Sequence, residues 1–200
     1  MNTQLAHTPL SHETLMSLEE YAKARPEFRA KVMEHKKNRR VALGPDATLY
    51  FEDRLTLQYQ IQEMLRIEKV FEADGIQDEL DAYNPLLPTG SNWKATFMLE
   101  YPNPEHRAEM LGKLIGIDKL VWVCIDGFDK VHPITNEDME RETEDKTSSV
   151  HFMRFELSPE MVAAAKSGAN ISMGVDHQNY THEVKQIDDA VRASLVSDLA

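Results

Sequence analysis

The sequence predicts a single α+β domain, in which helices pack on a mixed sheet and the chain closes with a strand–helix–strand (βαβ) unit. Residues 53–73 carry apolar side chains at helical spacing, whereas residues 92–101 alternate apolar and polar side chains like a half-buried strand. Near the end of the chain a short helix separates two strand-like segments. We divide the chain into a flexible N-terminal arm, the α+β domain, and an amphipathic C-terminal helix or tail: residues 1–16, 17–184 and 185–200.

The first helix is expected to begin at Ser17, because Ser17 and Glu20 form a capping box. Pro26 should break this helix or begin a second one, since inside a helix it removes a backbone hydrogen bond. Turn residues around Gly44 then predict a small hairpin.

The longest helix is predicted over residues 53–73, with Asp74 and Gly75 as its C-terminal signal. A short helical turn over residues 76–83 follows. A loop rich in proline, glycine and serine leads into the strand at residues 92–101.

In the second half of the chain, Asn103 caps a helix that is expected to end at Gly116. The apolar run at residues 120–126 is typical of a strand buried on both faces. Ser158, Pro159 and Gly168 then mark the cleanest helix of the sequence, as its N-cap, its first residue and the residue just past its end.

Composition excludes several classes of function. The formal net charge of −12 disfavours nucleic acid as a partner, because it repels phosphate backbones. A single cysteine, Cys124, can form neither an internal disulfide nor an iron–sulfur cluster by itself. No signal-peptide pattern and no membrane-spanning run is present, so we expect a cytoplasmic protein. The common nucleotide-binding, hydrolase, zinc-protease and di-iron motifs are also missing.

Glu68 and Glu72 are the candidate metal ligands of the long helix. Glu68 falls within an apolar arc, where a carboxylate needs a cation, a metal or a proton. One helical turn separates the two acids, so they could hold one ion together. A salt bridge with Arg54 or Lys69 is the simpler alternative.

His151 and His177 complete the candidate metal site, because each shares a strand face with apolar residues. If the intervening helix is a crossover between parallel strands, the two rings lie about 20 Å apart and cannot share an ion. If the strands are antiparallel, a joint site is open to them. We favour the parallel case, which makes His151 a core histidine bonded to Glu68 or to a backbone carbonyl.

In the parallel case His177 lies at the carboxyl end of its strand, where open α/β sheets place ligands. Asp176 and Tyr180 are its neighbours, and the three form the candidate acid–base site. Arg154, on the strand of His151, is the candidate for pairing with an anion or a cofactor carboxylate.

Long blocks of the chain resemble a bacterial family catalogued as domain of unknown function 3501. The resemblance covers nearly everything except the N-terminal arm and the C-terminal tail. Its blocks are SLEEYAKARPEFRAKVMEHKKNRRVALGP, YFEDRLTLQYQIQEMLRIEKVFE, ELDAYNPLLPTGSNWKATFMLEY, TSSVHFMRFELSPEM and GVDHQNY. Genes of this family commonly lie beside genes for a rubrerythrin-like protein and an iron–sulfur oxidoreductase, which implies a shared redox or peroxide-stress task.

The resulting hypothesis is an accessory protein of that redox system, which binds a partner protein and one iron or other divalent metal ion. The expected partners are the rubrerythrin-like and iron–sulfur proteins, with neither nucleic acid nor membrane involved and a homo-oligomer left open. One alternative is a small-molecule enzyme that uses His177, Asp176 and Tyr180. The other is a structural scaffold without a ligand.

Overall fold

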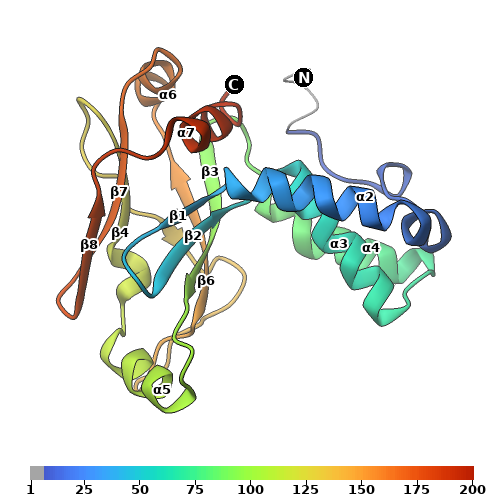
Figure 1. Cartoon of the computed structure of the whole chain (residues 1–200), viewed down its shortest axis with the longest axis horizontal. Coiled ribbons are helices and arrows are strands. Elements are labelled where there is room, and N and C mark those ends of the chain that lie inside the picture. The colour runs from blue at the N-terminus through green and yellow to red at the C-terminus, as the bar shows by residue number, and fades with distance from the viewer. Residues whose placement is uncertain (1–6) are drawn as a thin grey trace.

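The computed structural model describes residues 7–200, which form two β-sheets and a layer of helices (Figure 1). In chain order the elements are η1 (His12–Thr14), α2 (Leu18–Lys37), β1 (Arg40–Ala42), β2 (Ala47–Phe51), α3 (Arg54–Glu68), α4 (Ala73–Tyr83), η2 (Asn84–Leu86), β3 (Asn92–Leu99), α5 (Pro104–Lys113), η3 (Ile117–Leu120), β4 (Val121–Ile125), β5 (Ile134–Thr135), β6 (Val150–Glu156), α6 (Pro159–Lys166), β7 (Ile171–His177), β8 (Tyr180–Val184) and α7 (Asp189–Val196).

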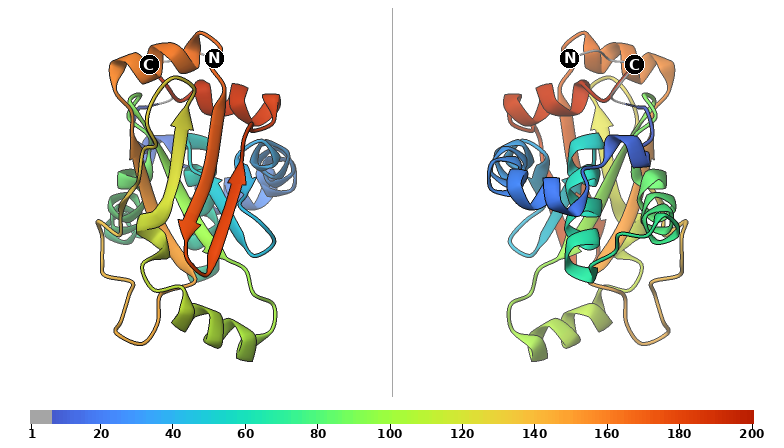
Figure 2. Two further views of the ribbon diagram at one scale, coloured as in Figure 1. Left: turned by 90° about the vertical axis from the view of Figure 1, so that its left-hand side faces the viewer. Right: turned by 90° about the vertical axis from the view of Figure 1, so that its right-hand side faces the viewer.

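The two sheets face each other across the main hydrophobic core. One sheet has the order β1-β2-β3-β6-β5 and the other the order β4-β7-β8. Their alternating inward residues, such as Trp93, Phe155 and Met173, are fully buried in one cluster. Figure 2 shows the three-stranded sheet towards the viewer on the left, and the helices α2 to α4 towards the viewer on the right. The five-stranded sheet is therefore the middle layer.

Helices α2 to α4 extend away from the five-stranded sheet and have a smaller core of their own (Figure 1). Glu63 of α3 joins α2 to α3: it accepts hydrogen bonds from the Tyr21 hydroxyl at 2.7 Å and from the Arg25 guanidinium at 2.7 and 2.9 Å. The buried apolar side chains of this layer are Leu10, Leu57, Ile61, Leu65, Leu80 and Leu87.

The α+β class is confirmed, and the strand–helix–strand order β6-α6-β7 is present as predicted. The pairing differs from the expectation of a mixed sheet with a parallel crossover. All strand pairs of both sheets are antiparallel, and β6 and β7 lie in different sheets. The short helix α6 therefore carries the chain from one sheet to the other, and β7 pairs with β4 and with the adjacent strand β8 instead.

Two helix boundaries also differ from the prediction. Pro26 lies inside the continuous helix α2, on its exposed side, where water can reach the carbonyl that loses its hydrogen bond. Helix α3 ends at Glu68 rather than near residue 73, because Lys69 adopts the left-handed conformation that closes the helix. Gly75 consequently lies within α4.

Part of the predicted N-terminal arm is packed against the body. The backbone of Leu10, which is buried, exchanges hydrogen bonds with the Asn84 side chain at 2.8 and 2.9 Å. Residues 1–6 of that arm lie outside the described part of the chain. At the other end α7 forms, and the apolar residues of this segment are buried in the main core: Val191 and Leu195 within the helix, Ile187 before it and Leu199 after it. No helix within residues 7–200 combines the length and apolar character needed to cross a membrane.

Candidate functional site

The structure does not bring the four predicted metal ligands together. Glu68 and Glu72 are exposed, at the end of α3 and just before α4. His151 lies in the five-stranded sheet and His177 in the three-stranded sheet. Within residues 7–200, no three His, Cys, Asp or Glu side chains are grouped closely enough to hold a metal ion. The predicted site of Glu68, Glu72, His151 and His177 therefore does not form, since the acids and the rings occupy separate layers.

His151 is a fully buried histidine with hydrogen-bond partners on both ring nitrogens. Its Nε2 atom lies 3.0 Å from the Ser148 carbonyl and 3.0 Å from the Thr147 hydroxyl. Its Nδ1 atom accepts from the Asn136 amide at 3.2 Å. Burial lowers the pKa of His151, and the charge of nearby Asp118 opposes this only in part. A backbone carbonyl is thus its partner, as expected, whereas Glu68 is not.

The candidate acid–base residues hold the structure together rather than lining a cavity. His177 is buried between the Ile115 carbonyl and the Asn179 amide. Tyr180 donates to the Leu43 carbonyl at 2.7 Å. Asp176 points to the opposite face of β7, where it forms an ion pair with Lys130 at 2.6 Å. Neither cavity described below is lined by His177, Asp176 or Tyr180.

Arg154, the candidate for anion pairing, lines the larger of two adjoining cavities between the helices and the five-stranded sheet. This cavity has a volume of about 430 Å³. Its wall comes from the end of α4 and from η2, its floor from β3 and β6, and its rim from the segment after β5. The lining includes Pro85, Leu86, Lys94, Glu137, Phe152 and Arg154. The volume is typical of a site for a small organic molecule.

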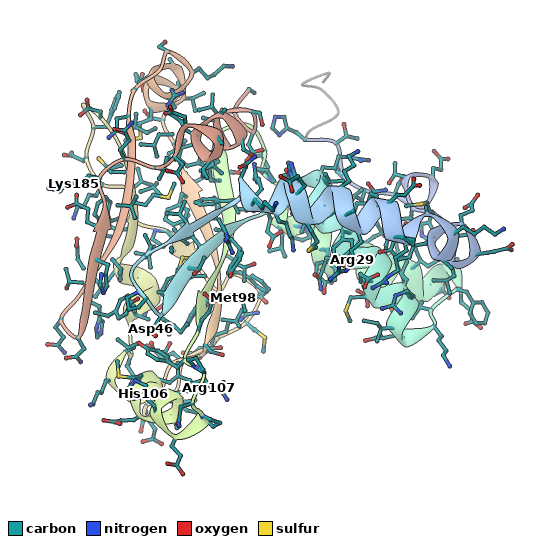
Figure 3. All side chains as sticks on the ribbon, in the orientation of Figure 1. Arg29, Asp46, Met98, His106, Arg107 and Lys185 are labelled. Atoms are coloured by element: carbon teal, nitrogen blue, oxygen red, sulfur yellow. The ribbon has the colours of Figure 1, made fainter. Side chains whose placement is uncertain are left out.

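The second cavity, of about 320 Å³, shares Leu86 and Phe152 with the first, so the two form one groove. Met98 belongs to its floor and lies on the side of β3 that faces the helices (Figure 3). Alternation along β3 explains this placement: Trp93, Ala95 and Phe97 point into the core, and the residues between them point into the groove.

Two cations occupy the floor of the larger cavity. Lys94 and Arg154 are directly opposite each other in the β3–β6 pair, on the groove side of the sheet. Arg154 is bound by Glu137, at 2.8 and 2.7 Å, and by Glu156. Lys94 is half-buried and donates to the Pro85 carbonyl at 2.7 Å. Burial, followed by the charge of Arg154, lowers the pKa of Lys94.

A different kind of surface lies at the corner between α3 and α4, here called the arm tip (residues 67–74). Phe71 is 74% exposed and Ile67 is 60% exposed. Carboxylates flank this apolar pair in the sequence: Glu68, Glu72 and Asp74 within the arm tip, and Asp78 and Glu79 in the following turn of α4. Partial burial raises the pKa of Glu79, and the charges of Glu68 and Asp78 raise it further. Glu68 and Asp78 therefore lie close enough to Glu79 to repel its carboxylate.

Comparison with known proteins decides the family. Residues 9–199 match the family described as "Protein of unknown function (DUF3501)". The chain belongs to the DUF3501 family. A crystal structure of a protein of unknown function from Burkholderia pseudomallei K96243 is similar, with 49% sequence identity and a TM-score of 0.92 over 96% of this chain and 100% of that one. No curated protein gives a significant match.

For this DUF3501 protein, sequence reasoning missed the groove and the arm tip. The alternation of apolar and polar residues in the sequence could have indicated the groove. Lys94 lies on the face of β3 opposite the buried apolar residues, and Arg154 lies on the corresponding face of β6. Only the β3–β6 pairing, which joins residues far apart in sequence, shows that the two cations are neighbours. The sequence pattern places residues 69–73 in the long helix, so it does not indicate that Phe71 is exposed.

Proposed function

We propose that this DUF3501 protein is an accessory protein of a cytoplasmic bacterial redox system with a peroxide-stress task, and that it acts by binding a partner protein through the arm tip. The exposure of Phe71 carries this proposal. A phenylalanine side chain 74% exposed to solvent leaves most of its apolar surface in water. Burying that surface against a partner would recover about 1.5–3 kcal/mol.

The composition of the arm tip supports a protein partner rather than a small ligand. Phe71 and Ile67 form an apolar centre, and the carboxylates around them form a charged rim. Protein interfaces commonly have this anatomy, with an aromatic residue at the centre and polar residues at the edge. The clustered acids favour a partner whose matching surface carries lysine or arginine.

The arm tip is also held in a fixed position. Glu63 joins α2 to α3 through Tyr21 and Arg25, and the apolar core of the helical layer joins α3 to α4. A preorganised surface loses little conformational entropy on binding, so even a small apolar centre can contribute to affinity.

The rubrerythrin-like protein and the iron–sulfur oxidoreductase remain the proposed partners, because the family resemblance implies that their genes lie beside those of this family. The proposal does not include the predicted metal ion, because residues 7–200 contain no group of His, Cys, Asp or Glu side chains that could hold one. The enzyme alternative is weakened because His177 and Tyr180 are committed to backbone hydrogen bonds.

Binding of purified partners to the full-length chain tests this proposal. The rubrerythrin-like protein and the iron–sulfur protein encoded beside a family member would be immobilised in turn, and the dissociation constant measured for each. The test variant is Ile67→Ser combined with Phe71→Ser. The control is Met139→Ser, because Met139 matches Ile67 in exposure, at 60% for each, but lies on the segment after β5.

We expect one of the two partners to bind, with affinity about tenfold lower or worse for the arm-tip variant. The Met139→Ser variant should bind like the wild type. Binding should weaken as salt is raised, because the rim is charged. Failure of both partners to bind the wild type, or equal binding by the arm-tip variant, would overturn the proposal.

A further inference from the structure

We infer that the larger cavity is a binding site for a small organic acid, whose carboxylate is held by Lys94 beside Arg154 and whose apolar body packs on Phe152 and Leu86. The inference goes beyond partner binding and does not depend on it, because the cavity lies against the sheet and the arm tip lies at the opposite end of the helices.

The first argument is the placement of two like charges. Lys94 and Arg154 are direct neighbours across the β3–β6 pair, and like charges in such a pair repel each other. The end of α4 and η2 wall this part of the sheet and Lys94 is half-buried, so water screens the repulsion less than at a fully open surface. Burial and then the charge of Arg154 lower the pKa of Lys94, although the carboxylates of Glu137 and Glu156 act against them. Glu137 and Glu156 already pair with Arg154 and offset part of this repulsion, so an anion bound to Lys94 would remove the part that remains.

The second argument is the hydrogen-bonding capacity of Lys94. A protonated amine has three N–H donors. Within the described part of the chain, the Lys94 amine donates one hydrogen bond, to the Pro85 carbonyl. Lys94 itself lines the cavity, so its remaining donors are available to a molecule bound there.

The third argument is the carboxylate already present on Arg154. Glu137 lies on the rim of the cavity, and its side chain is 51% exposed. Both of its carboxylate oxygens accept hydrogen bonds from the Arg154 guanidinium. A ligand carboxylate can make the same paired contact. Glu137 thus occupies part of the site and should compete with a ligand for Arg154.

The surrounding charges and apolar groups define the class of ligand. Glu137 and Glu156 pair with Arg154, and Asp81 lines the same cavity, so these carboxylates would repel a dianion such as phosphate more strongly than a monocarboxylate. Phe152, Leu86 and Pro85 provide an apolar wall for the body of the molecule. A monocarboxylate with a flat apolar body fits both features.

Titration of the full-length chain with benzoate tests the inference. Binding is monitored through the amide chemical shifts of the nitrogen-15-labelled protein. Benzamide is the neutral counterpart of the same shape, and inorganic phosphate is the dianion control. The variants are Lys94→Met, which removes the charge, and Glu137→Ala, which removes the competing carboxylate. Lys31→Met controls for the loss of one positive charge, because Lys31 is exposed on α2.

We expect benzoate to shift amides of β3 and β6, with affinity about tenfold lower in Lys94→Met and about threefold higher in Glu137→Ala. Lys31→Met should match the wild type, and benzamide and phosphate should bind more weakly than benzoate. Absence of benzoate binding, equal affinity in Lys94→Met, or tighter binding of phosphate would overturn the inference. If Lys94→Met does not fold, an affinity unchanged in Glu137→Ala would overturn it equally.

Discussion

The Arg39 guanidinium donates hydrogen bonds to both oxygens of the Asp198 carboxylate, at 3.1 and 2.7 Å, and both side chains are buried. Arg39 also donates to the backbone carbonyls of Phe51 and Glu52, at the end of β2. One buried ion pair therefore ties the end of the chain to the sheet that forms the floor of the groove.

Asp198→Asn should lower the free energy of unfolding by about 1–3 kcal/mol, because it removes the bidentate carboxylate and leaves Arg39 with the longer ion pair to Asp53, at 3.7 Å. Urea denaturation measures this loss. The double variant Arg39→Met with Asp198→Leu should recover most of it, since both charges of the pair are removed and Asp53 keeps its contact with His35. A loss below about 0.5 kcal/mol for Asp198→Asn would contradict the role given to this pair.

Glu63→Gln should lower the free energy of unfolding by about 1–2 kcal/mol, because it weakens the hydrogen bonds from Tyr21 and Arg25 that join α2 to α3. Hydrogen bonds from Arg25 hold the pKa of Glu63 well below its usual range. Its contribution is therefore present above the unfolded-state pKa of about 4.3 and is lost as the pH falls through the folded-state value. The difference in stability between the wild type and the variant should begin to shrink below about pH 4 and close only as the pH approaches the folded-state pKa, and a constant difference would be inconsistent with this.

His151 should make the protein less stable in mild acid. Its folded-state pKa is lowered by burial, so the unfolded chain takes up a proton more readily below the unfolded-state pKa of about 6.5. Stability should fall between about pH 7 and pH 5, and His151→Gln should flatten that part of the profile. Parallel stability profiles for the wild type and the variant would argue against it.

Phe71→Ser should leave the free energy of unfolding within about 0.5 kcal/mol of the wild-type value, because the side chain is 74% exposed. Thermal and urea unfolding of the single variant check this. A loss of several kcal/mol would mean that Phe71 packs within the protein, and the arm tip would then not be a free surface.

Helix ends could be predicted from the sequence because their determinants are local. Ser17 accepts from the Glu20 amide, Asn103 from the His106 amide and Ser158 from the Met161 amide, each three residues away. Such caps depend on a few adjacent residues, so the sequence shows them directly. The alternation around His151 likewise predicted a buried face of β6.

The pairing of strands could not be predicted in the same way. Local patterning indicates that β6 and β7 are strands, but the packing of the whole chain decides which sheet each joins. The position of Glu68 depended on Lys69 entering the left-handed region, which few non-glycine residues do. One such residue separates α3 from α4 and brings Phe71 to the surface.

Hydrogen exchange of the full-length chain, measured with and without the bound partner, tests the central claim most directly. We expect slowed exchange to be concentrated at the arm tip, residues 67–74, and at the adjacent ends of α3 and α4. Protection confined to the two sheets, with the arm tip unchanged in the complex, would contradict it.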